Sequence, residues 1–374
     1  MTQNILVVGA GLAGCTCARL LAEAGHQVYV IEKEKQIGGI CRDERDEQHN
    51  CFVHSCGPHL FHTNEKWIWD FVNRFGKFRE LKHKVMAYAR SREHKEIRRY
   101  FEFPVNYNTL TEFFEATIAT EKAAMKYMKP LKIDNPKNFE EACLAAVGEE
   151  IYRMFFKGYS ETQWRRKCTE LPADLLSRVP IKFNKDPYLF PDTYQGLPEE
   201  GYTKLMENML NHENISVYLD TPFEKFNEPN AYDAVIYTGG FEGLPYRSTR
   251  FIIVESHDEK YPVVNLPEHL AFTRRTNYSL LHKIDPEKKA RPDYMVGYEM
   301  PAKDNECNTL LPITTKENVE KFKDASTEFL RKYPNAILIG RLATYQYLDM
   351  DDVIDQCYSV LYGHQLIDNK SHEN

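Results

Sequence analysis

The first thirty-one residues alternate between short apolar runs and a glycine-rich turn. An apolar run at 5–8 precedes the turn 9–14, a stretch with helical spacing extends to Ala24, and a second apolar run covers 28–31. Short apolar runs bounded by turn residues are typical of buried strands, so the order is strand, turn, helix, strand. The pattern predicts a βαβ unit.

Two further patterns divide the middle of the chain. Apolar residues at helical spacing between about 108 and 177 predict a helical insertion. Short aromatic or β-branched runs at 85–88, 100–103 and 251–254 are bounded by polar turns and predict a separate sheet.

The last part of the chain is expected to return to the N-terminal unit. The run 336–339 predicts a buried strand, and 351–361 predicts a closing helix with aspartates in its first turn.

Composition excludes several classes of protein. With 374 residues, 42% hydrophobic and 28% charged, the chain suits a globular protein of two or three units. A net charge of -7 favours neither nucleic acid nor membrane as a partner, so an anionic ligand needs a local cluster of Arg or Lys. We find no basic leader and no run of about 18 apolar residues. Nine cysteines without a repeating framework favour reduced thiols and a cytoplasmic location.

The turn 9–14 carries the GxGxxG fingerprint in its proper context, between a strand and a helix. These glycines permit a tight turn and direct the helix N-terminus at a pyrophosphate. Glu32 ends the second strand, where a carboxylate can bind both ribose hydroxyls. The pair Gly38 and Gly39 resembles the extended fingerprint of FAD enzymes, which favours FAD over NAD. The alternative is a helix packed closely on a strand, with glycines that serve only sterics.

We therefore predict an α/β fold with a Rossmann-type FAD-binding domain, an inserted helical domain and an antiparallel sheet domain. The expected ranges are 1–80, 199–240 and 325–374 for the FAD-binding domain, 107–180 for the helical substrate or lid domain, and 81–106, 181–198 and 241–324 for the sheet domain.

A histidine-rich segment, 51–62, holds two cysteines and three histidines. Zinc is one interpretation, but structural zinc sites usually combine two separated ligand pairs, which this segment lacks. A core histidine held by backbone hydrogen bonds is the second. The third is a loop beneath a flavin, with His59 and His62 in the catalytic cavity.

Several blocks of sequence, in the same order, resemble the bacterial UDP-galactopyranose mutases. The blocks are 37–39, 57–63, 157–164, 194–196, 201–205, 340–343 and 345–350. The resemblance spans nearly the whole chain and implies an isomerase that interconverts pyranose and furanose forms of a nucleotide sugar. It implies that N5 of reduced FAD attacks the anomeric carbon and forms a flavin–sugar adduct without net oxidation. It also implies a homodimer and a role in polysaccharide biosynthesis.

The resemblance assigns roles residue by residue. The implied catalytic residues are His59, His62, Trp164, Arg178, Arg274, Tyr347 and Asp349. The implied cofactor-binding residues are Gly9, Gly11, Leu12, Ala13, Gly14, Glu32, Lys33, Gly38, Gly39, Ile40, His59, Leu60, Arg341, Met350 and Asp351. The implied substrate-binding residues are Asn106, Phe155, Tyr159, Ser160, Gln163, Trp164, Arg178, Tyr188, Asn265, Arg274 and Tyr347. No metal site is expected.

The chemistry suits these residue types. A leaving diphosphate needs guanidinium groups, and a flat base needs an aromatic face. Without the resemblance, Arg178 and Arg274 would be read as surface charges, and Phe155 and Tyr159 as helix core. We also expect the segment around Arg178 to act as a lid.

Three departures from the family pattern concern the substrate. Leu311 stands where the family has a tyrosine that donates to a phosphate, Ile40 replaces an asparagine, and Pro58 replaces a small residue. The sugar nucleotide is therefore UDP-galactopyranose or an analogue such as UDP-N-acetylgalactosamine or a dTDP-sugar. The alternatives are an amine-oxidase-like FAD oxidoreductase and a protein that binds the nucleotide without turnover.

Overall fold

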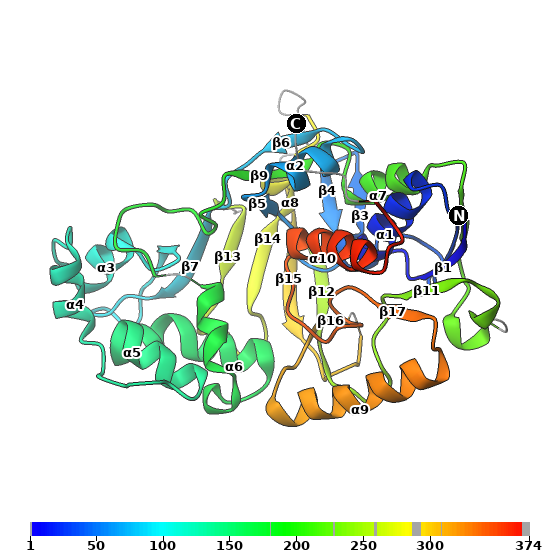
Figure 1. Cartoon of the computed structure of the whole chain (residues 1–374). Helices are drawn as coiled ribbons and strands as arrows, with labels where there is room; N and C mark the ends of the chain where they lie inside the picture. Colours follow the sequence, from blue (N-terminus) through cyan, green and yellow to red (C-terminus); the bar gives the residue numbers. More distant parts are fainter. Residues whose placement is uncertain are drawn as a thin grey trace.

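The computed structural model describes residues 2–179, 181–226, 229–257, 260–285, 293–307 and 309–368, the side chains of 309 and 310 excepted. Three groups of elements are arranged from one end of the molecule to the other (Figure 1). Helices of the middle of the chain lie at one end, a large sheet lies in the centre, and the elements of both chain ends meet at the other end. The predicted α/β class is confirmed.

The predicted βαβ unit is part of a five-stranded parallel sheet. Its strands, in spatial order, are β10 (Ile215–Tyr218), β2 (Gln27–Ile31), β1 (Asn4–Val8), β11 (Ala234–Tyr237) and β17 (Ala336–Leu338). Both predicted N-terminal strands and the predicted C-terminal strand are therefore present, and the chain end returns to this sheet as expected.

Helices cover both faces of this sheet because successive residues of a strand point to opposite sides. They are α1 (Leu12–Glu23), α7 (Tyr202–Leu210), α9 (Lys316–Lys332) and α10 (Met350–Gly363). Ile5 and Val7 of β1 pack in the core that contains α1 and α10, whereas Leu6 and Val8 pack in a core that Phe329 of α9 contacts. Both faces are buried, as a parallel sheet requires.

The second sheet has seven strands. In spatial order they are β16 (Thr309–Pro312), β12 (Tyr246–Ser256), β15 (Tyr294–Pro301), β14 (Arg274–Asn277), β13 (Val263–Asn265), β7 (Val85–Arg90) and β8 (Arg98–Phe103). The expected antiparallel pairing holds at every ladder except that β13 and β7 run parallel. At this ladder the β7–β8 hairpin, from an earlier part of the chain, joins the edge of the later strands.

Two smaller sheets connect these units. One pairs β3 (Asp43–Asp46) with β4 (Cys51–His54), and the other has the order β5 (Phe61–Thr63), β9 (Tyr194–Pro198), β6 (Phe78–Glu80). The short helices near them are η1 (Gly39–Cys41), α2 (Lys66–Asn73) and α8 (Tyr278–Leu281), whereas η5 (Phe223–Lys225) and η6 (Pro229–Ala231) lie beside the parallel sheet.

Two details differ from the expected ranges. Strand β9 was expected in the large sheet domain, but it pairs with two strands of the N-terminal range. Helix α9 runs through the boundary expected at 324/325 without interruption.

The helical insertion predicted from apolar spacing is present. It consists of α3 (Tyr107–Phe114), α4 (Glu121–Met128), α5 (Phe139–Ile151), the π-helix η2 (Tyr152–Lys157), α6 (Gly158–Trp164), and the 3₁₀ helices η3 (Cys168–Glu170) and η4 (Ala173–Arg178). Asn106, Thr120 and Asn138 each accept a backbone N–H at the start of a helix, the usual N-cap interaction. Among the described residues, no helix combines the length and apolarity that crossing a membrane demands. All nine cysteines are described, and none forms a disulfide.

Candidate active site

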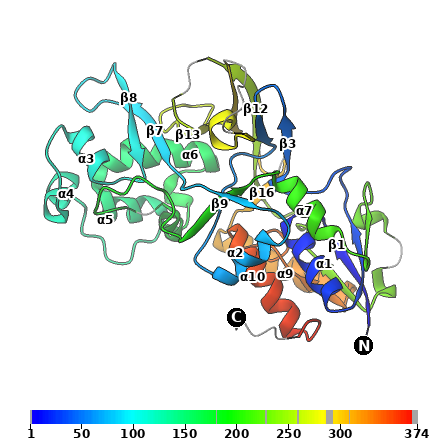
Figure 2. The same cartoon turned by 90° about the horizontal axis from the view of Figure 1, so that it is seen from above.

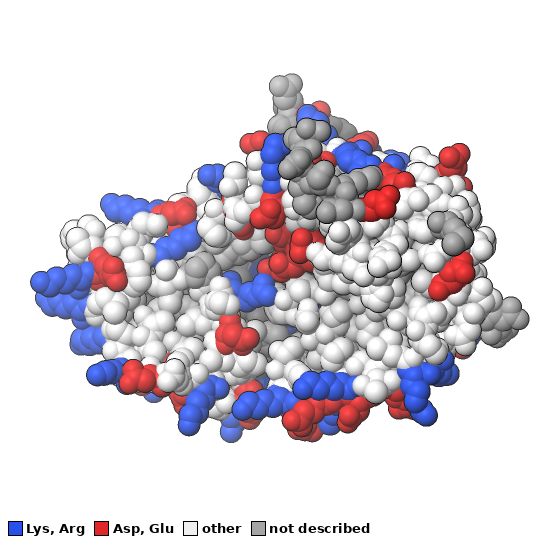
Figure 3. Space-filling model, viewed as in Figure 1, with Lys and Arg blue, Asp and Glu red and all other residues white. Residues whose placement is uncertain are grey.

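The candidate active site is a cavity of about 310 Å³ that is lined by residues of the N-terminal unit, the large sheet and the helical insertion. The surface is hollowed near the centre of the molecule, where basic and acidic side chains lie close together (Figure 3). Sixteen of the predicted site residues line this cavity: Ile40, His59, Leu60, His62, Phe155, Tyr159, Ser160, Gln163, Trp164, Arg178, Asn265, Arg274, Arg341, Tyr347, Asp349 and Met350. The fold thus brings together residues that are up to 310 positions apart in the sequence.

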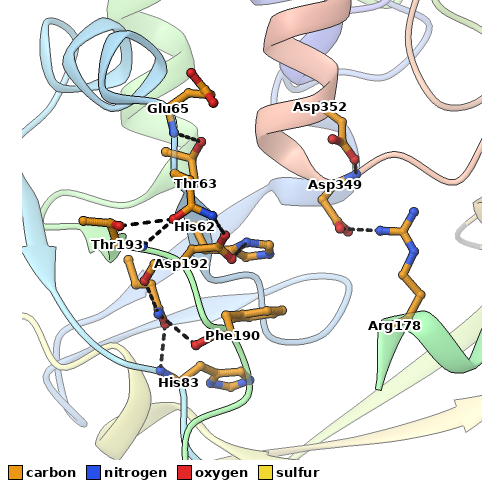
Figure 4. Close-up of polar contacts among 12 residues, drawn as sticks. His62, Thr63, Glu65, His83, Arg178, Phe190, Asp192, Thr193, Asp349 and Asp352 are labelled. Carbon is orange, nitrogen blue, oxygen red and sulfur yellow. Dashed lines mark hydrogen bonds and ion pairs between the residues drawn. The ribbon is translucent and has the colours of Figure 1, made fainter. Parts of the chain in front are cut away.

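Arg178 reaches the cavity from the end of η4 and is held by the loop before α10. Its guanidinium donates to Oδ2 of Asp349 at 2.5 Å (Figure 4), and it also donates to the backbone carbonyl of Tyr347 at 2.8 Å. It lies 4.2 Å from the ring centroid of Tyr347, a cation–π distance. Asp349 is also the N-cap of α10, in a capping box with Asp352. The ion pair therefore joins the helical insertion to the start of α10.

Arg274, on β14, lies in a buried polar group. Its guanidinium donates to the hydroxyl of Tyr159 at 2.9 Å, and its Nε is 3.4 Å from Oε1 of the buried Glu299. Burial disfavours the charged form of Arg274, but Glu299 and Tyr159 outweigh that effect and raise its pKa. Arg274 is therefore a fixed cation that faces the cavity.

Two charged residues of the cavity were missed by the sequence reasoning. Arg247, on β12, lies 5.4 Å from the ring of Trp164, and its buried Nε has no hydrogen-bond partner in the described part of the chain. Burial lowers the pKa of Arg247, yet a guanidinium remains charged at neutral pH. Glu299 is the second. No local signal marked either residue, because a strand pattern does not show which side chains will meet a cavity.

The lining carries an excess of positive charge. Its guanidinium groups belong to Arg178, Arg247, Arg274 and Arg341, and its carboxylates to Glu299 and Asp349. Two buried histidines of the cavity add no charge at neutral pH, because burial lowers the pKa of His59 to about 4 and that of His83 to about 3. The cavity therefore complements a ligand with about two negative charges.

The histidine-rich segment divides into two roles. His54 is buried, its Nδ1 accepts the backbone N–H of His59, and its Nε2 donates to Nδ1 of His282, which is the core interpretation. His59 and His62 line the cavity, which is the flavin-loop interpretation. Nδ1 of His62 lies 2.9 Å from Oδ2 of Asp192, and its ring stacks at 3.7 Å on Phe190 (Figure 4).

The glycine turn has the geometry of a dinucleotide cradle. A Cβ on Gly14 would lie 1.8 Å from the carbonyl oxygen of Gly9, and a Cβ on Gly39 would lie 3.1 Å from Cα of Gly11. The second glycine pair therefore packs on the first turn through backbone alone. The carboxylate of Glu32 accepts the backbone N–H of Ala10 at 2.7 Å, which holds it at the turn. These features fit the FAD pyrophosphate and ribose at the start of α1.

The remaining predicted residues lie outside the cavity. Leu12, Ala13 and Gly38 surround the cradle, Lys33 is exposed beside it, and Asp351 is in the first turn of α10. Asn106 is buried and its amide is used within the protein, where it caps α3 and donates to Glu102 and to the carbonyl of Asp186. Tyr188 contacts Lys82 instead of the cavity, whereas its neighbours Leu189 and Phe190 line it.

Comparisons with known proteins agree with this geometry. The family model "UDP-galactopyranose mutase" matches residues 154–347, and the model of an NAD(P)-binding Rossmann-like domain matches residues 7–75. The chain is 32% identical to dTDP-fucopyranose mutase of Escherichia coli, with 95% of this chain and 96% of that one covered. It is 31% identical to a probable UDP-galactopyranose mutase of Klebsiella pneumoniae, with coverage of 94% and 92%.

The fold is similar to that of a solved structure of reduced UDP-galactopyranose mutase. The TM-score is 0.74, the identity is 15%, and 98% of this chain and 94% of that chain are covered. L-amino acid oxidase Lm29 of Lachesis muta is 32% identical over only 20% of this chain. The similarity to that oxidase therefore leaves most of the chain uncovered, whereas the similarity to the mutases extends over nearly all of it.

Proposed function

The chain belongs to the UDP-galactopyranose mutase family, a family of isomerases, and on this premise we propose that it interconverts the pyranose and furanose forms of a nucleotide-linked sugar with FAD as cofactor. One observation carries the proposal. Arg178, Arg247 and Arg274 converge on a single cavity with Trp164 and Tyr347, although they come from three separate elements.

The arginines are the groups that would bind the diphosphate. A guanidinium gives a fixed charge and paired N–H donors that match phosphate oxygens. Arg274 is already oriented by Tyr159 and Glu299, so it binds without reorganisation. Arg178 is paired with Asp349 and can exchange that partner for a phosphate oxygen when the ligand arrives. When the bond from sugar to diphosphate breaks, these charges stabilise the leaving group.

Aromatic residues would hold the remaining parts of the substrate. Phe155, Tyr159 and Gln163 lie on consecutive turns of η2 and α6, and an aromatic face with polar neighbours suits a pyrimidine base. Phe155 also packs on Phe101 and Phe113, so it serves the core as well. Trp164 presents its ring to the cavity beside Arg247 and would cover the sugar.

Bound FAD, in its reduced form, would supply the nucleophile for the anomeric carbon. The cradle of Gly11, Gly39 and Glu32 would hold its nucleotide half, and His59, Arg341 and Met350 would face its ring system from the cavity. His59 donates from Nδ1 to the carbonyl of Gly57, which leaves Nε2 of the neutral ring as an acceptor.

An apolar wall distinguishes among possible sugars. Leu311 and Cys56 are buried and pack with Ile40, Trp164 and Tyr347, and all five residues line the cavity. A hydroxymethyl group against this wall would lose a hydrogen bond, at a cost of about 1–3 kcal/mol, whereas a methyl group would be accommodated. The wall therefore favours a 6-deoxyhexose over galactose. The relative from Escherichia coli is named for such a sugar, since it is a dTDP-fucopyranose mutase.

A cytoplasmic location and a homodimer complete the proposal. The nine unpaired thiols suit a reducing compartment. The family resemblance supports the dimer and a role in polysaccharide synthesis.

Chromatography of reaction mixtures tests the proposal. Purified protein is incubated with UDP-galactopyranose, UDP-N-acetylgalactosamine or dTDP-fucopyranose, each with and without dithionite. The expected result is a new furanose peak that requires dithionite and is largest with dTDP-fucopyranose. Oxygen consumption with a sugar or amine substrate, without a furanose peak, would support the oxidoreductase alternative instead.

A further inference from the structure

A second polar cluster lies apart from the cavity, where the turn between β3 and β4 meets the large sheet. His49, in this turn, is buried, with 1% of its surface exposed. Its Nε2 is directed at Glu255, at the end of β12, and at Asp293, just before β15. Figure 2 shows β3 and β12 side by side in this region. None of these residues has a part in the proposed reaction.

The hydrogen bond at the other ring nitrogen defines the state of His49. Nδ1 lies 3.0 Å from Oδ1 of Asp46, and a carboxylate oxygen can only accept, so Nδ1 carries the proton. In the neutral ring, Nε2 then presents a lone pair to two further carboxylates. Within the described residues this buried nitrogen has no hydrogen-bond partner. A positive charge between this nitrogen and the carboxylates would give the buried lone pair of His49 a partner.

The distances favour a metal ion over a proton. Nε2 lies 3.6 Å from Oε1 of Glu255 and 3.8 Å from Oδ2 of Asp293, both longer than a hydrogen bond of about 2.7–3.2 Å. Two ligands of one tetrahedral Zn²⁺ ion, each at about 2.1 Å, are about 3.4 Å apart. The three ligand atoms lie within 4.8 Å of one another. Glu255 and Asp293 also interact with other groups, so these two carboxylates would bind the ion in addition to their present partners.

A second histidine cluster provides the contrast. His54 and His282 are 2.8 Å apart and joined by a hydrogen bond, and Asp43 accepts the backbone N–H groups of Tyr202 and Thr203. In contrast to Nε2 of His49, each of these side chains already makes close hydrogen bonds within the protein.

We propose that His49, Glu255 and Asp293 bind a divalent transition-metal ion, with Zn²⁺ as the best match to one imidazole and two carboxylates. Asp46 orients the imidazole from behind, the usual arrangement of a carboxylate, a histidine and a metal. Water completes the coordination, since the side chain of Glu255 is half exposed. The ion ties the β3–β4 turn to the large sheet, and the site is structural.

The turn is prepared for this role without the ion. The backbone N–H of His49 donates to Asp46 at 2.8 Å, and the side chain of Asn50 donates to the carbonyl of Asp285 at 2.6 Å. The turn that carries His49 is therefore held in place before the metal arrives, which reduces the entropic cost of binding.

Calorimetric titration of the full-length, FAD-containing protein with Zn²⁺, after removal of metals with a chelator, tests the site. We expect saturable binding of one equivalent, an increase in the melting temperature, and no comparable effect of Mg²⁺. Glu255→Gln is expected to abolish this binding, and because the side chain of Glu255 is half exposed, we expect the variant to fold. Asp46→Asn is expected to weaken it by about 10–100-fold.

His94→Gln is the matched control, because His94 is an exposed histidine with a glutamate 3.8 Å away but no further carboxylate partner among the ion pairs of the described residues. It should bind Zn²⁺ as the unmodified protein does. Absence of saturable binding, or equal binding by Glu255→Gln, would overturn the proposal.

Discussion

Replacement of Arg178 by alanine separates catalysis from stability. In the free protein the Arg178 side chain is 35% exposed and its partner Asp349 is 32% exposed, so this ion pair contributes at most about 1 kcal/mol to folding. In the reaction the same guanidinium would face the charge that develops on the diphosphate. Removal of one such preorganised donor costs about 2.7–4 kcal/mol of transition-state stabilisation, or a factor of 10²–10³ in kcat.

The assay is furanose formation by Arg178→Ala under dithionite, with bound FAD and unfolding free energy measured on the same sample. We expect kcat to fall at least about 100-fold, with FAD content unchanged and a loss of stability below about 1 kcal/mol. Arg92→Ala is the matched control, because Arg92 forms an ion pair of similar exposure with Glu150 outside the cavity. A kcat for Arg178→Ala close to that of the control would refute the assigned role.

Three further predictions concern the cofactor, the sugar and pH. Gly11→Ala should fold, because the added Cβ meets no protein atom closer than 3.7 Å, but it should lose most of its FAD, because this Cβ lies where the pyrophosphate approaches. Flavin absorbance at equal protein concentration, with Gly363→Ala as control, tests this. Leu311→Tyr should shift the ratio of kcat/KM values by about tenfold toward UDP-galactopyranose over dTDP-fucopyranose, since a phenolic hydroxyl at the apolar wall could bond the hydroxymethyl group that galactose carries and fucose lacks; an unchanged ratio contradicts the role of that wall. Burial lowers the pKa of His83 to about 3 and that of His282 to about 4, below the value of about 6.5 for an unfolded histidine. Below pH 6.5 the unfolded chain therefore takes up protons that the folded protein does not bind, so the folded state is fully stable above pH 6.5 and loses stability as the pH falls. Urea unfolding should thus show a loss of about 2 kcal/mol for each histidine between pH 7.5 and 5, and a flat profile would argue against neutral buried rings.

Much of the fold was predictable because local patterns and tertiary structure agree. The glycine turn lies between a strand and a helix that the apolar runs already define, and a Cβ on Gly14 would lie 1.8 Å from the carbonyl oxygen of Gly9, a distance that no side chain could adopt. The helical insertion was visible because Leu110, Phe113 and Phe114 are buried along one face of α3. The parallel pairing of β13 with β7 was not predictable, since no local pattern encodes which distant strands meet.

The site was predictable only in part, for a similar reason. Arg178 and Arg274 were found through motif resemblance, whereas Arg247 and Glu299 lie in strands without a motif and reach the cavity through the sheet register. Asn106 was expected at the substrate, but its side chain caps α3. A local signal for that role was present, since asparagine just before an apolar helical stretch is a preferred N-cap residue.

The central claim is that this protein is a mutase that uses reduced FAD and returns it unchanged. Chemically reduced protein, kept without oxygen, is mixed with a large excess of dTDP-fucopyranose or UDP-galactopyranose and followed by NMR and flavin absorbance together. The account predicts many turnovers of pyranose to furanose while the flavin stays reduced. Oxidation of one flavin for each substrate consumed, or equal turnover by the oxidised protein, would contradict it.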